Sequence, residues 1–375
     1  MRAVIVAADV ITAYGPGLDC LWAGVCAGQS AIRPVDRFPV EAFACRKAAL
    51  IDSLDVHAPD SLVMQMLRPM LKHGPHEWPA STKLLLATTT GEIDVLERGI
   101  VEQRKDLADS RMTILLEQVS QCCGGLKKGL VISSACASST AAIAQAASLI
   151  RSGIEASVLV VACDCVTEFV FSGFSALRAL SPEVARPFDR HRDGLSLGEG
   201  AGYVLMMSAD LAQRLGQPIL GEVMGWGMSN DANHMTGPSR DGAGLKHAIE
   251  LAFQTSGASA NEVRAVCAHG TGTVYNDSME LKAFKAVFEQ ARPTFSIKGG
   301  TGHTMGSAGL IEALLALQVA KTGIVPGTVG LQEPDEEAVG WASPENQVCG
   351  PGWILSTNSG FGGTNAALLL KRNRE

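Results

Sequence analysis

The sequence is poor in aromatic residues, in positive charge and in long apolar runs. Aromatic residues make up 5% of the 375 positions, although 46% are hydrophobic and 40 are glycine. Many small residues and few rings are typical of a tightly packed α/β protein with close backbone approaches. The net charge of −7 argues against nucleic-acid binding, which depends on neutralising phosphates. Because no apolar run reaches about 18 residues, we expect no membrane span.

The cysteines also lack the paired spacing of a zinc site. Cys122 and Cys123 are adjacent, and Cys163 and Cys165 are separated by a single residue. The N-terminus begins at once with a strand-like run and carries no secretion signal. We therefore expect reduced thiols, no metal and a cytoplasmic location.

Strand-like and helix-like segments alternate along the chain, which predicts an α/β fold with a mixed, largely parallel sheet and helices on its faces. The length exceeds what a single hydrophobic core usually supports, so we expect two units. A polar segment followed by Pro218 places their boundary near 211–217, giving units 1–215 and 216–375. The expected strands are 3–8, 84–88, 131–134, 157–162, 203–207, 220–227, 266–269, 294–297, 353–356 and 366–371. The expected helices are 137–152, 243–255, 278–288 and 307–321.

Cys136 lies where the apolar run Val131–Ser134 meets an alanine-rich helical segment. We expect it on the first turn of that helix, where unpaired N–H groups and the helix dipole favour a thiolate over a thiol. A neighbourhood of small residues leaves room for a substrate carbonyl. The simpler alternative is a buried structural cysteine, as most cysteines are.

Three further segments combine glycines with reactive side chains. They are A-H-G-T-G-T-V-Y-N-D with His269, S-I-K-G-G-T-G-H with Lys298 and His303, and T-N-S-G-F-G-G-T-N. Taken singly, each has an ordinary reading: a structural histidine, an exposed lysine, a tight hairpin. Together with Cys136 they form a Cys–His–His–Lys set at strand ends, where α/β folds place ligands.

These segments resemble the β-ketoacyl-[acyl carrier protein] synthases of the elongating type II kind, in the thiolase superfamily. The similarity spans nearly the whole chain, and its motifs follow one another in order. They are S-A-C-A-S-S at 134–139, A-R-P-F-D-R-H-R-D-G-L-S-L-G-E-G-A-G at 185–202, H-M-T-G-P-S-R-D-G-A-G at 234–244, H-G-T-G-T at 269–273, K-x-x-x-G-H at 298–303 and G-F-G-G-T-N at 360–365.

The resemblance implies a thiolase-like fold, with two similar α/β halves forming a five-layered α-β-α-β-α core. It implies that Cys136 carries an acyl chain as a thioester, while His269 and His303 flank a malonyl thioester. Hydrogen bonds from two neutral imidazoles would stabilise the enolate that forms when CO₂ leaves. The backbone N–H groups of Cys136 and Phe361 would form the oxyanion hole.

The remaining site residues follow from the same resemblance. Lys298 is expected to hold a charge network with Glu312, and Asp277 to be structural. Thr271 and Thr273 are expected to contact the phosphopantetheine arm of the carrier, which belongs to the substrate. Phe361 and Gly362 are expected at the acyl pocket.

Two departures from the family pattern suggest a specialised synthase. Aligned on the glycines of N-S-F-G-F-G-G-T-N, the chain has Ser359 at the first aromatic position, and the region 43–125 is short. The expected partners are an acyl carrier protein and a second subunit, identical or synthase-like. Two alternatives stay open: a non-catalytic subunit that sets chain length, and a coenzyme A thiolase. Six basic residues are candidates for contact with an acidic partner: Arg46, Lys47, Arg68, Lys72, Lys127 and Lys128.

Overall fold

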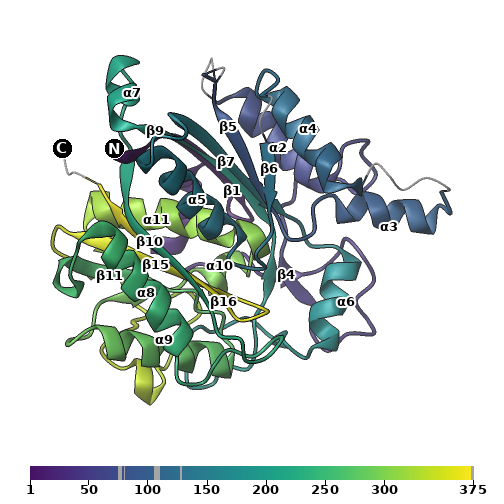
Figure 1. The fold of residues 1–375 in the computed structure, drawn as a ribbon. Coiled ribbons are helices and arrows are strands. Elements are labelled where there is room, and N and C mark those ends of the chain that lie inside the picture. Colours follow the sequence, from purple (N-terminus) through teal and green to yellow (C-terminus); the bar gives the residue numbers. More distant parts are fainter. Residues whose placement is uncertain (75–77, 80, 105–109, 127–128, 373–375) are drawn as a thin grey trace.

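The computed structural model describes residues 1–74, 78–79, 81–104, 110–126 and 129–372 (Figure 1). Most of its strands lie in one sheet: β1 (Ala3–Thr12), β2 (Gly15–Pro16), β5 (Lys83–Ala87), β6 (Gly129–Ile132), β7 (Ser157–Asp164), β9 (Gly200–Ser208), β10 (Gly221–Asn230), β11 (Val263–Cys267), β12 (Thr294–Phe295), β15 (Trp353–Gly360) and β16 (Thr364–Lys371). Two small sheets contain β3 (Arg33–Pro34), β4 (Lys47–Ala49) and β8 (Leu197–Gly198), and β13 (Ile324–Val325) and β14 (Gln347–Val348).

Helices cover both faces of the large sheet. They are α1 (Leu18–Cys26), α2 (Leu62–Lys72), α3 (Ile93–Val101), α4 (Met112–Cys122), α5 (Ser138–Arg151), α6 (Glu168–Ala176), α7 (Ala209–Arg214), α8 (Ala243–Ser256), α9 (Val274–Val287), α10 (Lys298–Thr301) and α11 (Ala308–Thr322). Short 3-10 helices occupy Ala260–Glu262, Met305–Ser307 and Glu336–Ala338. In the part of the chain described, no helix is both long and apolar enough to cross a membrane.

The large sheet consists of two halves with the same pairing pattern. Its strand order is β12-β11-β15-β16-β10-β1-β9-β7-β5-β6. In the first half β1 and β7 run antiparallel to β9, while β7, β5 and β6 are parallel. In the second half β10 and β15 run antiparallel to β16, while β15, β11 and β12 are parallel. A short antiparallel pairing of β1 with β10 joins the halves. The sheet is mixed, as expected, but antiparallel pairings predominate among the described strands, so the expectation of a largely parallel sheet was wrong.

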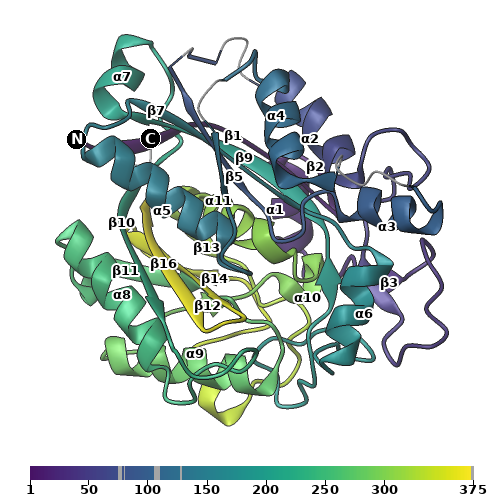
Figure 2. The ribbon, with the colours of Figure 1, turned by 45° about the vertical axis from the view of Figure 1, so that its right-hand side comes forward.

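The hydrophobic residues divide the molecule into five layers. Successive residues of a strand point to opposite faces, so Leu85 and Val160 pack inward while Leu84 and Leu159 pack outward. The inner cluster contains α5 and α11 together with residues from strands of both halves. Helices α2 and α4 cover the outer face of the first half, and α8 and α9 cover that of the second (Figures 1 and 2). The expected α-β-α-β-α arrangement is therefore confirmed.

The sequence located every long strand of this sheet, but several element bounds differ. Strand β11 ends at Cys267 rather than at His269, and α9 begins at Val274 rather than at Ser278. Strand β12 contains only two residues, Thr294 and Phe295. Helices α1, α2, α3, α4 and α6 were not expected. Because the halves share one sheet and one inner core, their division into units 1–215 and 216–375 stays a prediction.

Equivalent connections of the two halves meet at the centre of the molecule. Strand β6 leads through Cys136 into α5, and β12 leads through Lys298 and His303 into α11. The two helices begin side by side, since the backbone N–H of Leu310 donates to Ser139 Oγ at 2.9 Å. The topology alone therefore brings the cysteine loop of one half to the histidine loop of the other.

Candidate active site

Cys136 occupies a tight elbow between β6 and α5. Ala135 has a φ of 48°, a left-handed conformation that is strained for a residue with a side chain. Ser138 Oγ closes the turn, because it accepts from Ser134 N at 2.8 Å and donates to Ala135 O at 2.6 Å. The helix begins only at Ser138, so the expected position of Cys136 on its first turn was wrong. The turn places the cysteine just before the helix.

The expected thiolate was also wrong. Burial raises the pKa of Cys136 to about 11. The charge of Lys298 and the N–H groups of Phe361 and Cys136 lower this pKa, but they do not offset the loss of hydration. At neutral pH the resting residue is therefore a thiol. Both N–H groups nevertheless face the sulfur, where an oxyanion hole needs them.

This ionisation state predicts how Cys136 reacts with iodoacetamide. We expect the alkylation rate to rise about tenfold per pH unit from neutral pH upward, because the reactive thiolate stays a small fraction below its pKa of about 11. Mass spectrometry of the Cys136 peptide follows the reaction, with the exposed Cys20 as an internal reference. A rate that levels off near neutral pH would show that the thiol is already ionised.

His269 and His303 lie beside the sulfur in one cavity. His269 follows β11 and His303 follows α10. Their ring centroids are 5.1 Å apart in an edge-to-face arrangement. One nitrogen of each ring and Cys136 Sγ lie within 4.8 Å of one another. The structure thus brings together three residues that are 133 and 34 positions apart in the chain.

The surroundings of the two rings determine which nitrogen carries hydrogen. Nδ1 of His303 accepts from the backbone N–H of Met305 at 3.3 Å. Nδ1 of His269 faces two donors, Asn358 Nδ2 at 3.2 Å and Lys298 Nζ at 3.3 Å. Since both Nδ1 atoms face donors, each Nε2 bears the hydrogen. Burial, followed by the charge of Lys298, lowers the pKa of both histidines well below the usual range. Both rings are neutral hydrogen-bond donors.

A cysteine and two histidines so close together also match the ligand types of a zinc site. Histidines that bind zinc normally donate from their second nitrogen to an oxygen acceptor. Here the second nitrogens face donors, and the Lys298 ammonium lies 3.3 Å from one of them. The surroundings of the rings therefore oppose a bound cation.

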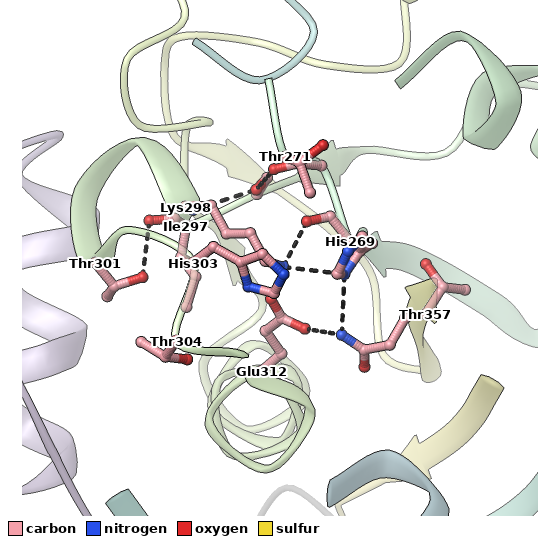
Figure 3. Close-up of polar contacts among 12 residues, drawn as sticks. His269, Thr271, Ile297, Lys298, Thr301, His303, Thr304, Glu312 and Thr357 are labelled. Atoms are coloured by element: carbon pink, nitrogen blue, oxygen red, sulfur yellow. Dashed lines mark hydrogen bonds and ion pairs between the residues drawn. The ribbon is translucent and has the colours of Figure 1, made fainter. Parts of the chain in front are cut away.

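Lys298 and Glu312 form a buried ion pair next to the two histidines (Figure 3). Both side chains are 1% exposed. Lys298 Nζ also donates to the carbonyl oxygen of His269 at 2.5 Å. The second carboxylate oxygen of Glu312 accepts from Asn358 Nδ2 at 2.7 Å. The pairing expected from the sequence is present, and it fixes the backbone as well as the ring of His269.

Two buried carboxylates hold the loop that carries His269. Asp277 accepts from the backbone N–H groups of Phe188 at 2.8 Å and Thr271 at 3.0 Å, which fits the expected structural role. Glu280 accepts from the N–H groups of His269 at 2.8 Å and Gly270 at 2.6 Å. Glu280 was not identified from the sequence, although its position one helical turn after Asp277 was a usable signal.

Replacing Glu280 tests how much this support contributes to stability. In Glu280→Gln, the amide presents N–H groups where the backbone already donates, so one buried donor loses its partner. We expect the free energy of unfolding to fall by about 1–3 kcal/mol. Urea denaturation measures the change, and the exposed Glu289→Gln is the control. Equal stability of the two variants would contradict the role assigned to Glu280.

Cys136, His269 and His303, together called the catalytic set, line a cavity of about 880 Å³. Its lining includes Thr271 and Thr273, whose hydroxyl oxygens are 3.0 Å apart. Phe361 stacks on Phe174 with ring centroids 5.7 Å apart. Ser359 also lines the cavity, and its hydroxyl donates to Asn365 Oδ1 at 2.8 Å. The two threonines, Ser359 and Phe361 therefore line the same cavity as Cys136 and the two histidines.

Gly362 does not line this cavity, contrary to the expectation. Its N–H donates to the carbonyl oxygen of Met235 at 2.7 Å, and its own carbonyl accepts from Asn230 Nδ2 at 2.9 Å. Its φ of 83° belongs to the tight turn between β15 and β16. Gly362 thus shapes the turn that presents Phe361.

Four of the six basic candidates for partner contact are described by the structure, and none of these four lines the catalytic cavity. Lys47 forms an ion pair with Glu183 at 2.5 Å, and Arg68 forms one with Asp60 at 2.8 Å. Lys127 and Lys128 fall outside the described residues. Arg178 and Arg240 were not among the candidates, yet both line the catalytic cavity. The structure therefore adds two guanidinium groups at this cavity.

Comparison with known proteins identifies both halves of the chain. The family model "Beta-ketoacyl synthase, N-terminal domain" matches residues 119–212, and "Beta-ketoacyl synthase, C-terminal domain" matches residues 220–332. The 3-oxoacyl-[acyl-carrier-protein] synthase 2 of Rhizobium meliloti is 30% identical, with 99% of each chain covered. The enzyme of the same name from Vibrio cholerae is 29% identical, again with 99% of each chain covered.

Solved structures agree with these matches. A structure described as the ishigamide ketosynthase/chain length factor aligns with a TM-score of 0.89 and 27% identity, covering 99% of both chains. A β-ketoacyl synthase from Burkholderia phymatum aligns with a TM-score of 0.85 and 26% identity, covering 100% of both. The fold expected from the sequence motifs is therefore the fold of this chain.

Proposed function

The chain belongs to the β-ketoacyl synthase family of condensing enzymes, and we propose that it extends an acyl chain held on Cys136 with a malonyl unit carried by an acyl carrier protein. The product is a 3-oxoacyl-[acyl carrier protein], in fatty-acid or specialised polyene- or polyketide-type elongation. The observation that carries this proposal is the pair of neutral imidazoles, His269 and His303, whose ring nitrogens lie within 4.8 Å of Cys136 Sγ and of each other.

In the first half-reaction, Cys136 Sγ attacks the carbonyl carbon of the acyl carrier thioester. A C–S bond forms, and the N–H groups of Cys136 and Phe361 stabilise the oxyanion. When the intermediate collapses, the bond to the carrier sulfur breaks. The cysteine proton ends on that departing thiolate. Because both Nε2 atoms already bear hydrogen, neither histidine is assigned the role of base.

In the second half-reaction, the bond between the malonyl α-carbon and its carboxylate breaks and CO₂ leaves. The electron pair forms an enolate, and the Nε2 hydrogens of His269 and His303 stabilise its oxygen. The enolate carbon attacks the Cys136 thioester, so a C–C bond forms and the C–S bond breaks. The released thiolate takes a proton from water. Loss of CO₂ drives the reaction, and the scheme uses no metal or cofactor.

The proposed partners are the acyl carrier protein and a second subunit. The phosphopantetheine arm would pass Thr271 and Thr273, which line the cavity. One similar structure is described as a ketosynthase/chain length factor. This favours a dimer, built either from two copies of this chain or from one copy and a related synthase-like subunit.

The cavity argues against both alternatives to a condensing enzyme. A non-catalytic chain-length subunit has no need of the nucleophile, yet Cys136, His269, His303 and Lys298 are all present and converge. A coenzyme A thiolase typically uses a second cysteine as acid and base, whereas His303 stands here as a neutral donor.

Mass spectrometry of Cys136 after exposure to a panel of acyl carriers tests the proposal. We expect an acyl adduct on this residue and, once malonyl carrier is added, its conversion to 3-oxoacyl carrier with release of CO₂. Absence of any adduct would favour the chain-length subunit. Elongation with acetyl coenzyme A and no malonyl group would favour the thiolase. The adduct that forms fastest also identifies the preferred acyl chain.

A further inference from the structure

Asn358 is a fully buried amide at the junction of the two halves, and no step of the mechanism above uses it. Its Oδ1 accepts from Thr140 Oγ1 at 2.5 Å, and Thr140 lies on α5, four positions after the nucleophile. Its Nδ2 donates to Glu312 Oε2 at 2.7 Å and lies 3.2 Å from His269 Nδ1. The amide therefore touches the nucleophile helix, the charge network and one catalytic ring.

The orientation of this amide follows from its neighbours. Both oxygens of Glu312 act as acceptors, one toward Lys298 and the other toward Asn358. The amide must therefore present its nitrogen to Glu312 and its oxygen to Thr140. In that orientation the second N–H of Nδ2 points to Nδ1 of His269.

Lys298 is the other donor near Nδ1, but its shorter contacts lie elsewhere. Its ammonium donates to the carbonyl oxygen of His269 at 2.5 Å and to Glu312, and it lies 3.3 Å from Nδ1. An imidazole nitrogen has a single in-plane lone pair, so only one donor can lie along it. Asn358 Nδ2 lies 3.2 Å from His269 Nδ1 and donates one hydrogen to Glu312. Among the described contacts, its second hydrogen has no acceptor other than Nδ1.

We propose that Asn358 is the positioning residue that keeps Nδ1 of His269 an acceptor and thereby keeps the reactive hydrogen on Nε2, facing the substrate. The role of this hydrogen in stabilising the enolate rests on the proposed function. Which nitrogen of His269 bears the hydrogen does not. The titratable and charged groups around this ring are Lys298, Glu312, His303 and Cys136, with Glu280 on its backbone N–H.

Gly309 allows this arrangement. A Cβ at this position would lie 1.9 Å from Thr140 Oγ1 and 2.8 Å from Asn358 Oδ1. The backbone of α11 therefore packs directly on the Thr140–Asn358 hydrogen bond. The hydrogen bonds of this amide therefore connect His269 with the helix that follows Cys136.

Nuclear magnetic resonance of ¹⁵N-labelled histidine side chains tests the proposal directly. We expect His269 of the wild type to stay neutral with hydrogen on Nε2 from about pH 5 to 8. In Asn358→Asp the new carboxyl group contacts Glu312 Oε2, so the two carboxyl groups share one proton. The oxygen that faces His269 is then an acceptor instead of a donor, so Nδ1 acquires a hydrogen, either by a tautomer change or by formation of an imidazolium. Malonyl decarboxylation then falls about 10²-fold, the loss typical of one missing donor. Acylation of Cys136 changes much less.

Further variants separate positioning from stability. Thr140→Val removes the donor to Oδ1 and should shift the His269 resonances partially, while Thr140→Ser restores the wild-type spectrum. Asn346→Asp, whose amide donates only to the carbonyl oxygen of Cys26 among the described contacts, is the control and should change neither readout. A His269 that keeps its hydrogen on Nε2 in Asn358→Asp overturns the proposal. A wild type that shows the expected ring state but never decarboxylates malonyl thioesters instead overturns the proposed function.

Discussion

We expect Cys136→Gln to abolish chain extension but to leave malonyl decarboxylation intact or faster. The variant has no sulfur to carry the acyl chain, so formation of 3-oxoacyl product falls by about 10³-fold or more. The donors at Nε2 of His269 and His303 remain in place, because their partners are Lys298, Asn358 and the N–H of Met305. The side-chain amide occupies part of the space in which an acyl chain would sit.

The two activities are measured in the same sample. Release of ¹⁴CO₂ from carboxyl-labelled malonyl carrier reports decarboxylation, and mass spectrometry of the carrier reports extension. Cys20→Gln is the matched control, because this cysteine is exposed and far from the catalytic set in sequence. Loss of both activities in a Cys136→Gln protein with wild-type circular dichroism would contradict the division of labour between sulfur and imidazoles.

We expect His303→Ala to show the opposite pattern to Cys136→Gln, with slower decarboxylation but continued acylation. His303→Ala deletes one of the two hydrogen bonds to the developing enolate, so decarboxylation is expected to fall by about 10²- to 10³-fold. Acylation of Cys136 continues, because the oxyanion-hole donors of that step are the N–H groups of Cys136 and Phe361. Since Nδ1 of His303 is held by the backbone rather than by a side chain, no other ionisable group loses its partner.

His303→Asn refines this test. Its amide keeps an N–H donor in the cavity and should recover part of the lost rate. His247→Ala is the control, because that side chain lies on the outer helix α8 and is 61% exposed. An unchanged rate of CO₂ release in His303→Ala would rule out the role assigned to this ring.

The sequence was sufficient to predict the features that depend on local pattern. Continuous apolar runs marked the buried strands. The small-residue segment after one of them marked the loop that carries Cys136, and glycine-rich segments marked the loops that carry His269 and Lys298. Helices α1, α2, α3, α4 and α6 were missed. For α2 the local pattern was a usable signal, because Ser61 caps its first turn and its apolar residues pack on the outer face of the first half.

Features that depend on burial or on distant partners could not be predicted. A helix terminus near Cys136 suggested a thiolate, but the pKa depends on how deeply the folded chain buries the sulfur. The hydrogen on His269 depends on Lys298 and Asn358, which lie 29 and 89 positions away in the chain. Gly362 belongs to the correct turn but faces Met235 rather than the cavity.

The joining of the two halves has a consequence for fragments of this protein. One half supplies the sulfur, and the other supplies both imidazoles, the ammonium and the carboxylate beneath them. Polypeptides cut between α7 and β10 and produced separately would each be inert. Turnover would return only by complementation, when the fragments reassociate through the β1–β10 edge and the adjoining helices α5 and α11.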